Sequence, residues 1–158
     1  MAAGDVYSIV HRRIVVATAI TIIQVKAGAN SPLEIIRAWC NQSASTTSAQ
    51  VAIALIRKSG AATVTAGVVG TTVLKRSPNS GTPDLSLGTS ATGITATAEG
   101  TDSDEIYPDG FNNVGGWLYL PVPEERVIVP VNGIIALKFM AAPTSNTFTA
   151  GIVVRELG

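Results

Sequence analysis

The chain has 158 residues, of which 46% are hydrophobic and only 14% are charged. Its eleven basic and eleven acidic residues cancel, and no run of Lys and Arg exceeds two residues, which excludes the charge profile of a nucleic-acid-binding protein. The length suits one domain with a substantial core. Because an average soluble domain has roughly 25% charged residues, we expect uncharged polar side chains and burial in an oligomer to cover the surface.

A single cysteine, Cys40, excludes an intrachain disulfide and a cysteine-based zinc cluster. The best candidate for a membrane span, residues 14–25, contains Thr and Gln and is shorter than the ~20 residues of a spanning helix, so it is predicted to be a strand. At the N-terminus, the basic residues 11–13 follow the first apolar run, whereas those of a signal peptide precede it. We therefore expect no membrane contact.

Short runs of β-forming residues, separated by turn residues, predict about nine strands and no convincing helix. The expected strands are residues 8–17, 21–27, 32–41, 50–58, 93–98, 116–121, 126–131, 134–140 and 147–156. Residues 66–75 combine valines with Gly and Thr, and their poor helix propensity favours strand or irregular structure. Residues 76–92 are rich in Ser, Gly, Pro and Thr, which predicts a long exposed loop.

This pattern predicts an all-β fold in a single domain covering residues 1–158. The expected architecture is an antiparallel sandwich of eight to nine strands. We expect it to be jelly-roll-like, because the Cys…Trp…Cys spacing of an immunoglobulin domain is missing.

Aromatic and basic residues gather near the N-terminus. Tyr7, His11, Arg12 and Arg13 are candidates for contact with another subunit or another partner, on a flexible arm of about residues 1–12 that orders on docking. A first strand with a basic end fits the sequence equally well.

The pair Asn132-Gly133 separates the apolar runs RVIVPV and IIALKF and predicts a tight β-hairpin. In that register Val131 faces Ile134, and both faces of the hairpin are apolar. The second face must then meet another sheet layer, a loop or another subunit. We predict a subunit contact formed by Val127, Val129, Val131, Ile134 and Ala136.

The segment GWLYLP places Trp117 and Tyr119 on one face of a strand and Leu118 and Leu120 on the other. The aromatic pair is expected in the core. If it were exposed, it would offer a platform for a sugar or a protein.

Four carboxylates, Asp102, Asp104, Glu105 and Asp109, form the only dense acidic cluster. They are a weak calcium candidate, because carboxylate oxygens ligate Ca²⁺ but the twelve-residue EF-hand pattern is missing. A solvated acidic loop, or a patch that pairs with a neighbour's arginines, is the alternative. We predict no metal and no cofactor.

Catalysis is not expected. His11 is the only histidine, no Gly-x-Ser-x-Gly elbow is present, and Cys40 lies beside Trp39 in an apolar run where a buried thiol is typical. The glycines match neither a P-loop nor a dinucleotide-binding pattern.

Several segments together resemble the capsid decoration proteins of tailed bacteriophages, also called cement or auxiliary head proteins. They are YSIVHRRI, LEIIRAWCNQSAS, AQVAIALIRKSG, ITATAEGTD, GGWLYLPVPEERVIVPVNGIIALKF and FTAGIVVREL, and they span most of the chain.

The resemblance implies a virion protein with a jelly-roll or related sandwich fold. Such a protein would sit on the outer capsid surface as a homotrimer and bridge major capsid subunits, with no role for nucleic acid or membrane. The alternative is a carbohydrate- or receptor-binding jelly-roll module of a phage tail or surface structure, using Trp117, Tyr119 and the acidic residues.

Overall fold

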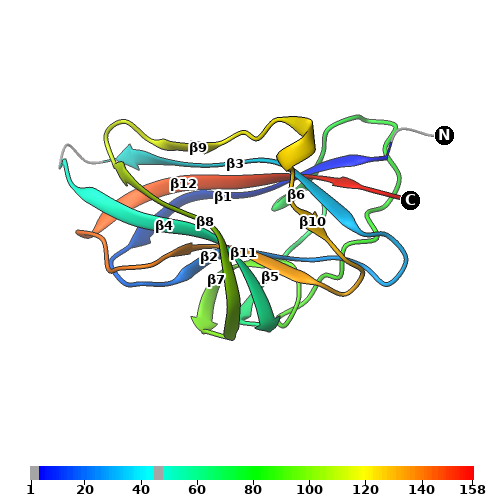
Figure 1. Ribbon diagram of the computed structural model, residues 1–158, viewed down its shortest axis with the longest axis horizontal. Coiled ribbons are helices and arrows are strands. Elements are labelled where there is room, and N and C mark those ends of the chain that lie inside the picture. Colours follow the sequence, from blue (N-terminus) through cyan, green and yellow to red (C-terminus); the bar gives the residue numbers. More distant parts are fainter. Residues whose placement is uncertain (1–3, 45–47) are drawn as a thin grey trace.

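The computed structural model describes residues 4–44 and 48–158 and contains two antiparallel sheets packed face to face (Figure 1). The strands are β1 (Val6–Val16), β2 (Thr21–Lys26), β3 (Leu33–Ala44), β4 (Gln50–Gly60), β5 (Thr63–Ala66), β6 (Val73–Lys75), β7 (Gly93–Ala98), β8 (Thr101–Asn112), β9 (Trp117–Tyr119), β10 (Ile128–Val129), β11 (Ile134–Phe139) and β12 (Asn146–Glu156). A single 3-10 turn, η1 (Pro123–Glu125), lies between β9 and β10. No helix in the described part of the chain is long and apolar enough to cross a membrane.

The strand order identifies the topology. The first sheet has the order β10-β3-β12-β1-β6, with β9 also paired to β3, and the second has the order β5-β7-β2-β11-β4-β8. In these sheets β1 pairs with β12, β2 with β11 and β4 with β8, while β3 lies beside β9 and β10. Such nesting of early strands with late strands is the arrangement of a jelly roll. The predicted fold class is confirmed.

The structure has twelve strands, more than the eight to nine predicted. The sequence did not predict β5 and β8, whereas β6 falls within residues 66–75, where strand or irregular structure was expected. Both β5 and β6 are short, and β8 has a polar, acidic sequence that is typical of a loop. Because β8 is an edge strand, only one side of it pairs, and exposed charges on such an edge also discourage pairing with other chains.

Residues pointing inward from both sheets form one large core. The rings of Phe139 on β11 and Phe148 on β12 meet at its centre, with centroids 5.0 Å apart, and both are fully buried. The two sheets therefore pack against each other through β11 and β12, which are both interior strands of their sheets.

The predicted hairpin at Asn132-Gly133 is wrong. The turn exists, but the Gly133 amide donates to the Pro130 carbonyl, so the central residues are Val131 and Asn132, and Asn132 has a φ of 59°. A positive φ at only the second central position is the requirement of a type II turn, which splays the flanking strands. Consequently β10 joins β3 in one sheet, whereas β11 joins β2 and β4 in the other.

The predicted N-terminal arm is also revised. Residues 6–12 belong to β1, which lies between β12 and β6, and the prediction for residues 1–3 lies outside the described residues. The strand alternative is the one observed from Val6 onward.

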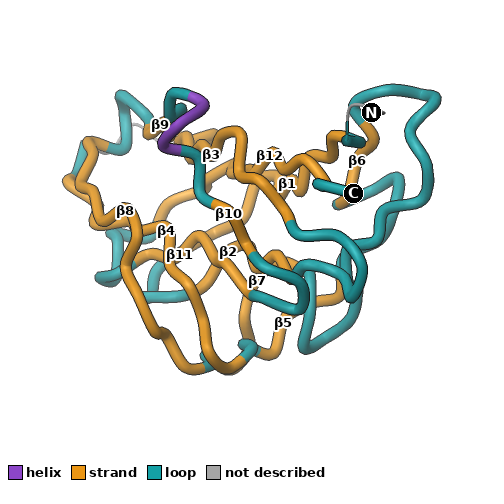
Figure 2. Tube along the Cα trace, turned by 45° about the vertical axis from the view of Figure 1, so that its right-hand side comes forward, coloured by secondary structure: helices purple, strands orange, loops and turns teal. Residues whose placement is uncertain are grey.

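The predicted loop at residues 76–92 has little regular structure, as Figure 2 shows, but it is only partly exposed. Leu85 inserts into the core, and its amide and that of Asp84 donate to the Glu156 carboxylate at 3.2 and 2.7 Å. Asp84 in turn accepts hydrogen bonds from the amides of Asn30 and Ser31. The loop is therefore fixed against the β2–β3 connection and the end of β12.

Candidate functional site

The acidic residues that the sequence predicted in one loop are spread along the edge strand β8. Asp102 belongs to an ion-pair network, and the side chains of Asp104 and Glu105 are exposed. Among residues 4–44 and 48–158, no group of three or more His, Cys, Asp or Glu side chains could hold a metal ion. The structure therefore does not bring the four calcium candidates together into one site.

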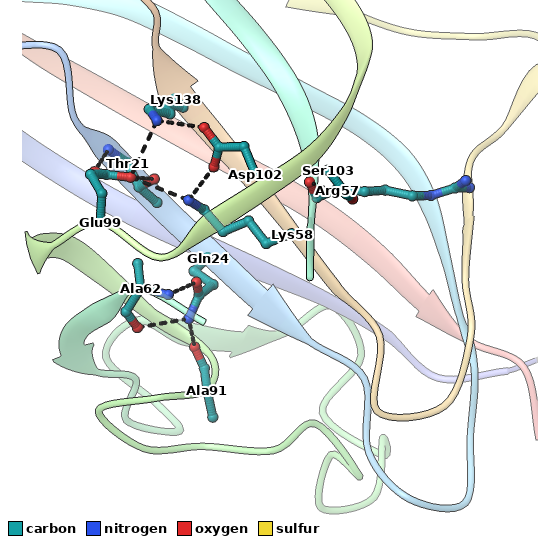
Figure 3. A network of polar contacts seen from close by, with 10 residues as sticks. All are labelled: Thr21, Gln24, Arg57, Lys58, Ala62, Ala91, Glu99, Asp102, Ser103 and Lys138. Atoms are coloured by element: carbon teal, nitrogen blue, oxygen red, sulfur yellow. Dashed lines mark hydrogen bonds and ion pairs between the residues drawn. The ribbon is translucent and has the colours of Figure 1, made fainter. Parts of the chain in front are cut away.

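Asp102 and Glu99 flank two lysines where the chain passes over the outer face of the second sheet (Figure 3). The Lys58 ammonium lies 2.6 Å from Asp102 Oδ1 and 3.2 Å from Glu99 Oε2, and the Lys138 ammonium lies 2.6 Å from Asp102 Oδ2. Glu99 also accepts hydrogen bonds from the amide and hydroxyl of Thr21. This network ties the β7–β8 connection to β2, β4 and β11.

The electrostatics of this network favour the charged carboxylates. Burial tends to raise the pKa of Glu99, but hydrogen bonds from Thr21 and Lys58 outweigh it, and the pKa is lowered. Burial also tends to raise the pKa of Asp102, and hydrogen bonds from Lys138 and Lys58 again produce a lowered value. Two carboxylates and two ammonium groups balance here, so the cluster is suited to holding the fold together rather than to acid–base chemistry.

Most of the predicted interface residues of the 126–136 segment are not available to another subunit. Val127 and Val129 pack in the core of the sandwich, and Ala136 is fully buried. Ala136 lies beside Gln24, which is held by hydrogen bonds to the backbone of Ala62 and Ala91 (Figure 3). The second apolar face therefore meets this chain's own loops. Only Val131 is exposed, and Ile134 is half-buried.

The predicted N-terminal contacts divide in the same way. Tyr7 is fully buried, and its hydroxyl lies 3.3 Å from Asp5 Oδ2 and 3.2 Å from the Gly81 carbonyl oxygen, either of which can accept its proton. A bulge in β1 turns both Arg12 and Arg13 outward, and Arg13 adopts a φ of 55° there. These two arginines remain exposed candidates for a contact.

The side chain of His11 is half-buried, and its Nε2 lies 2.5 Å from the hydroxyl of Thr95. Burial lowers its pKa to about 4, so the ring is neutral at pH 7. The thiol of Cys40 is buried, and burial raises its pKa to about 12, so it stays protonated. The protonated thiol is a poor nucleophile, and an imidazole with so low a pKa is a weak base.

We expect His11 to make the protein sensitive to mild acid. Its folded-state pKa of about 4 lies below the ordinary 6.5, so between these values the unfolded chain binds a proton that the folded chain does not. The stability is thus complete above pH 6.5 and is lost as the pH falls toward 4, by about 2 kcal/mol after allowance for partial exposure.

Urea unfolding at several pH values measures this loss. His11→Asn keeps a hydrogen-bonding group beside Thr95 but does not titrate, so the stability of the variant should fall less steeply between pH 6.5 and 4. Identical slopes for the two proteins would contradict the assignment.

The aromatic strand β9 is arranged as the sequence predicted. Trp117 and Tyr119 are buried, whereas Leu118 and Leu120 are more than half exposed. The indole of Trp117 donates to Asp109 Oδ2 at 2.9 Å, and the ring of Tyr119 meets that of Tyr107 with centroids 4.8 Å apart. These contacts close the side of the sandwich between β8 and β9.

An apolar surface lies above this closure, and we call it the apolar edge: Tyr107, Leu120, Pro121 and Val122. It surrounds a pocket of about 310 Å³, whose lining also includes Tyr119 and Val127. Leu120 and Val122 are 63% and 55% exposed. Sequence reasoning did not name this surface, although the alternation in GWLYLP implied it: once Trp117 and Tyr119 enter the core, the leucines must face outward.

A second hollow of about 360 Å³ lies where β3 meets β9. We call it the Trp39 hollow; its lining comprises Arg37, Trp39, Asn41, Gly115, Gly116, Trp117 and Leu118. No carboxylate lines it. It is polar where the apolar edge is hydrophobic, so the two surfaces suit different partners.

Comparison with known proteins adds no relative: no family model, no curated protein and no solved structure matches this chain.

Proposed function

We propose that this chain is a structural protein of a phage capsid, which binds the outside of the shell as a homotrimer and stabilises it by bridging major capsid subunits. The observation that carries the proposal is the apolar edge. Leu120 and Val122 are exposed at the rim of an aromatic pocket, and contiguous apolar patches of this kind mark protein contacts.

Three further features support this proposal. The fold is a jelly-roll sandwich, as the resemblance to capsid decoration proteins implied. The histidine is a weak base and the cysteine stays protonated, which fits a protein that acts by contact and not by chemistry. The low charged fraction of 14% fits a surface that is partly covered in an assembly.

The apolar edge is proposed to be the contact between copies in the trimer. It replaces the contact first predicted around residues 127–136, most of which is internal. Arg12 and Arg13 lie on β1, away from β8 and β9 in the strand order, and are left to meet the major capsid protein.

Co-sedimentation tests the capsid role. Capsids of the phage that encodes this chain, assembled without it, are mixed with the purified protein and pelleted. We expect the protein to pellet with the capsids to a saturating ratio and to raise their disruption temperature with occupancy, because a ligand that binds only the assembled shell stabilises it by mass action. Protein that stays in the supernatant at every concentration would refute the role.

A further inference from the structure

Trp39 lies on the outer face of the first sheet, supported by a glycine on the adjacent strand. A Cβ atom on Gly151 of β12 would lie only 2.2 Å from two atoms of the indole ring, so the ring rests on the glycine backbone. Any other residue at position 151 would force the ring away from the sheet. The glycine thus gives the sheet a firmly backed aromatic surface.

The guanidinium of Arg37 shares this hollow with the ring. Its central carbon lies 4.9 Å from the ring centroid of Trp39, a cation–π contact. In the part of the chain that the structure describes, no Asp or Glu forms an ion pair with Arg37. The N–H donors of an arginine side chain can bind a carboxylate in a bidentate pair. The guanidinium of Arg37 is therefore open to a carboxylate from a ligand.

Asn41 and Gly116 form the far wall. Asn41 is exposed, and its Oδ1 would lie 2.0 Å from a Cβ at position 116, where the φ of 74° also favours glycine. The side-chain amide can both donate and accept hydrogen bonds. The volume of about 360 Å³ falls within the ~300–1,000 Å³ range of small-molecule sites.

We propose that the Trp39 hollow binds an acidic saccharide. The sugar carboxylate pairs with the Arg37 guanidinium, which the indole supports from the side of the sheet, and the Asn41 amide binds ring hydroxyls. The site differs from the sugar platform considered from the sequence, because Trp117 and Tyr119 are buried. It goes beyond the proposed capsid role and stands without it, since the hollow belongs to a single chain.

The full chain is titrated with a trigalacturonate oligosaccharide, and with the neutral oligosaccharide maltotriose for comparison, while tryptophan fluorescence and saturation-transfer NMR are recorded. We expect saturable binding of the acidic oligosaccharide with a change in fluorescence, and at least about tenfold weaker binding of the neutral one, since charge-assisted hydrogen bonds are the strong ones. Equal binding of both sugars, or no binding of the acidic one, would overturn the proposal.

Two variants locate the site. Arg37→Ala should weaken binding of the acidic oligosaccharide at least about tenfold, and Trp39→Phe should weaken it while removing the fluorescence change. Arg76→Ala, which removes an exposed charge from the loop after β6, is the matched control and should bind like the unmodified chain. Unfolding curves show whether each variant is folded. A folded Arg37→Ala protein that binds as tightly as the control would overturn the proposal.

Discussion

Replacing Lys58 with alanine is expected to lower the free energy of unfolding by about 3 kcal/mol. The side chain of Lys58 is completely buried and pairs with both Glu99 and Asp102. Without it, two carboxylates that are about two-thirds buried keep only Lys138 as a counter-ion. The two carboxylates would then repel each other next to Gly100. A Cβ at Gly100 would lie 2.1 Å from the Gly60 carbonyl oxygen, so the backbone there has little room to relax.

Urea unfolding at pH 7 measures this cost. Arg57→Ala removes a neighbouring exposed charge from the same strand and should cost less than about 1 kcal/mol. Because the pKa values of Glu99 and Asp102 are lowered, the stability from the network is present at neutral pH and is lost as the pH falls between about 5 and 3. The difference between the two variants should therefore shrink in acid. If Lys58→Ala lowered the free energy of unfolding as little as Arg57→Ala does, the ion-pair network would not be what holds the β7–β8 connection in place.

Replacing Leu120 with aspartate is expected to convert the proposed trimer to monomers without unfolding the chain. Leu120 is 63% exposed in the single chain and lies at the rim of the aromatic pocket, so the proposed interface would bury it. A carboxylate buried there without a partner costs several kcal/mol, and each 1.4 kcal/mol lowers an association constant tenfold. At micromolar concentrations we expect monomers to predominate.

Val68→Asp is the matched control for that variant. Val68 is also more than half exposed, but it lies before β6, on the opposite edge of the first sheet from β9. Its aspartate variant should stay trimeric. Light scattering gives the mass of each protein, and circular dichroism confirms the strand content. Trimers of Leu120→Asp with the same stability as those of Val68→Asp would place the contact elsewhere.

Period-two alternation in GWLYLP correctly placed Trp117 and Tyr119 in the core, because burial of one face follows from strand geometry alone. The Asn-Gly pair correctly marked a turn but not its type. A turn signal is local, whereas the sheet that each flanking strand joins depends on distant partners, here β3 for β10 and β2 with β4 for β11.

The acidic strand β8 and the two candidate surfaces could not be predicted either, because they also depend on residues that are distant in the sequence. An edge strand needs no apolar pattern on its free side, so its sequence resembles that of a loop. The Trp39 hollow joins residues 37–41 to residues 115–118 and rests on Gly151, three segments that are far apart in the chain. No spacing in the sequence reports that proximity.

The solution mass of the unmodified chain tests the proposed trimer most directly. The monomer has a mass of 16.3 kDa. Light scattering coupled to size-exclusion chromatography should give three times this value across a range of micromolar concentrations. A constant mass of one chain over that range would contradict assembly through the apolar edge.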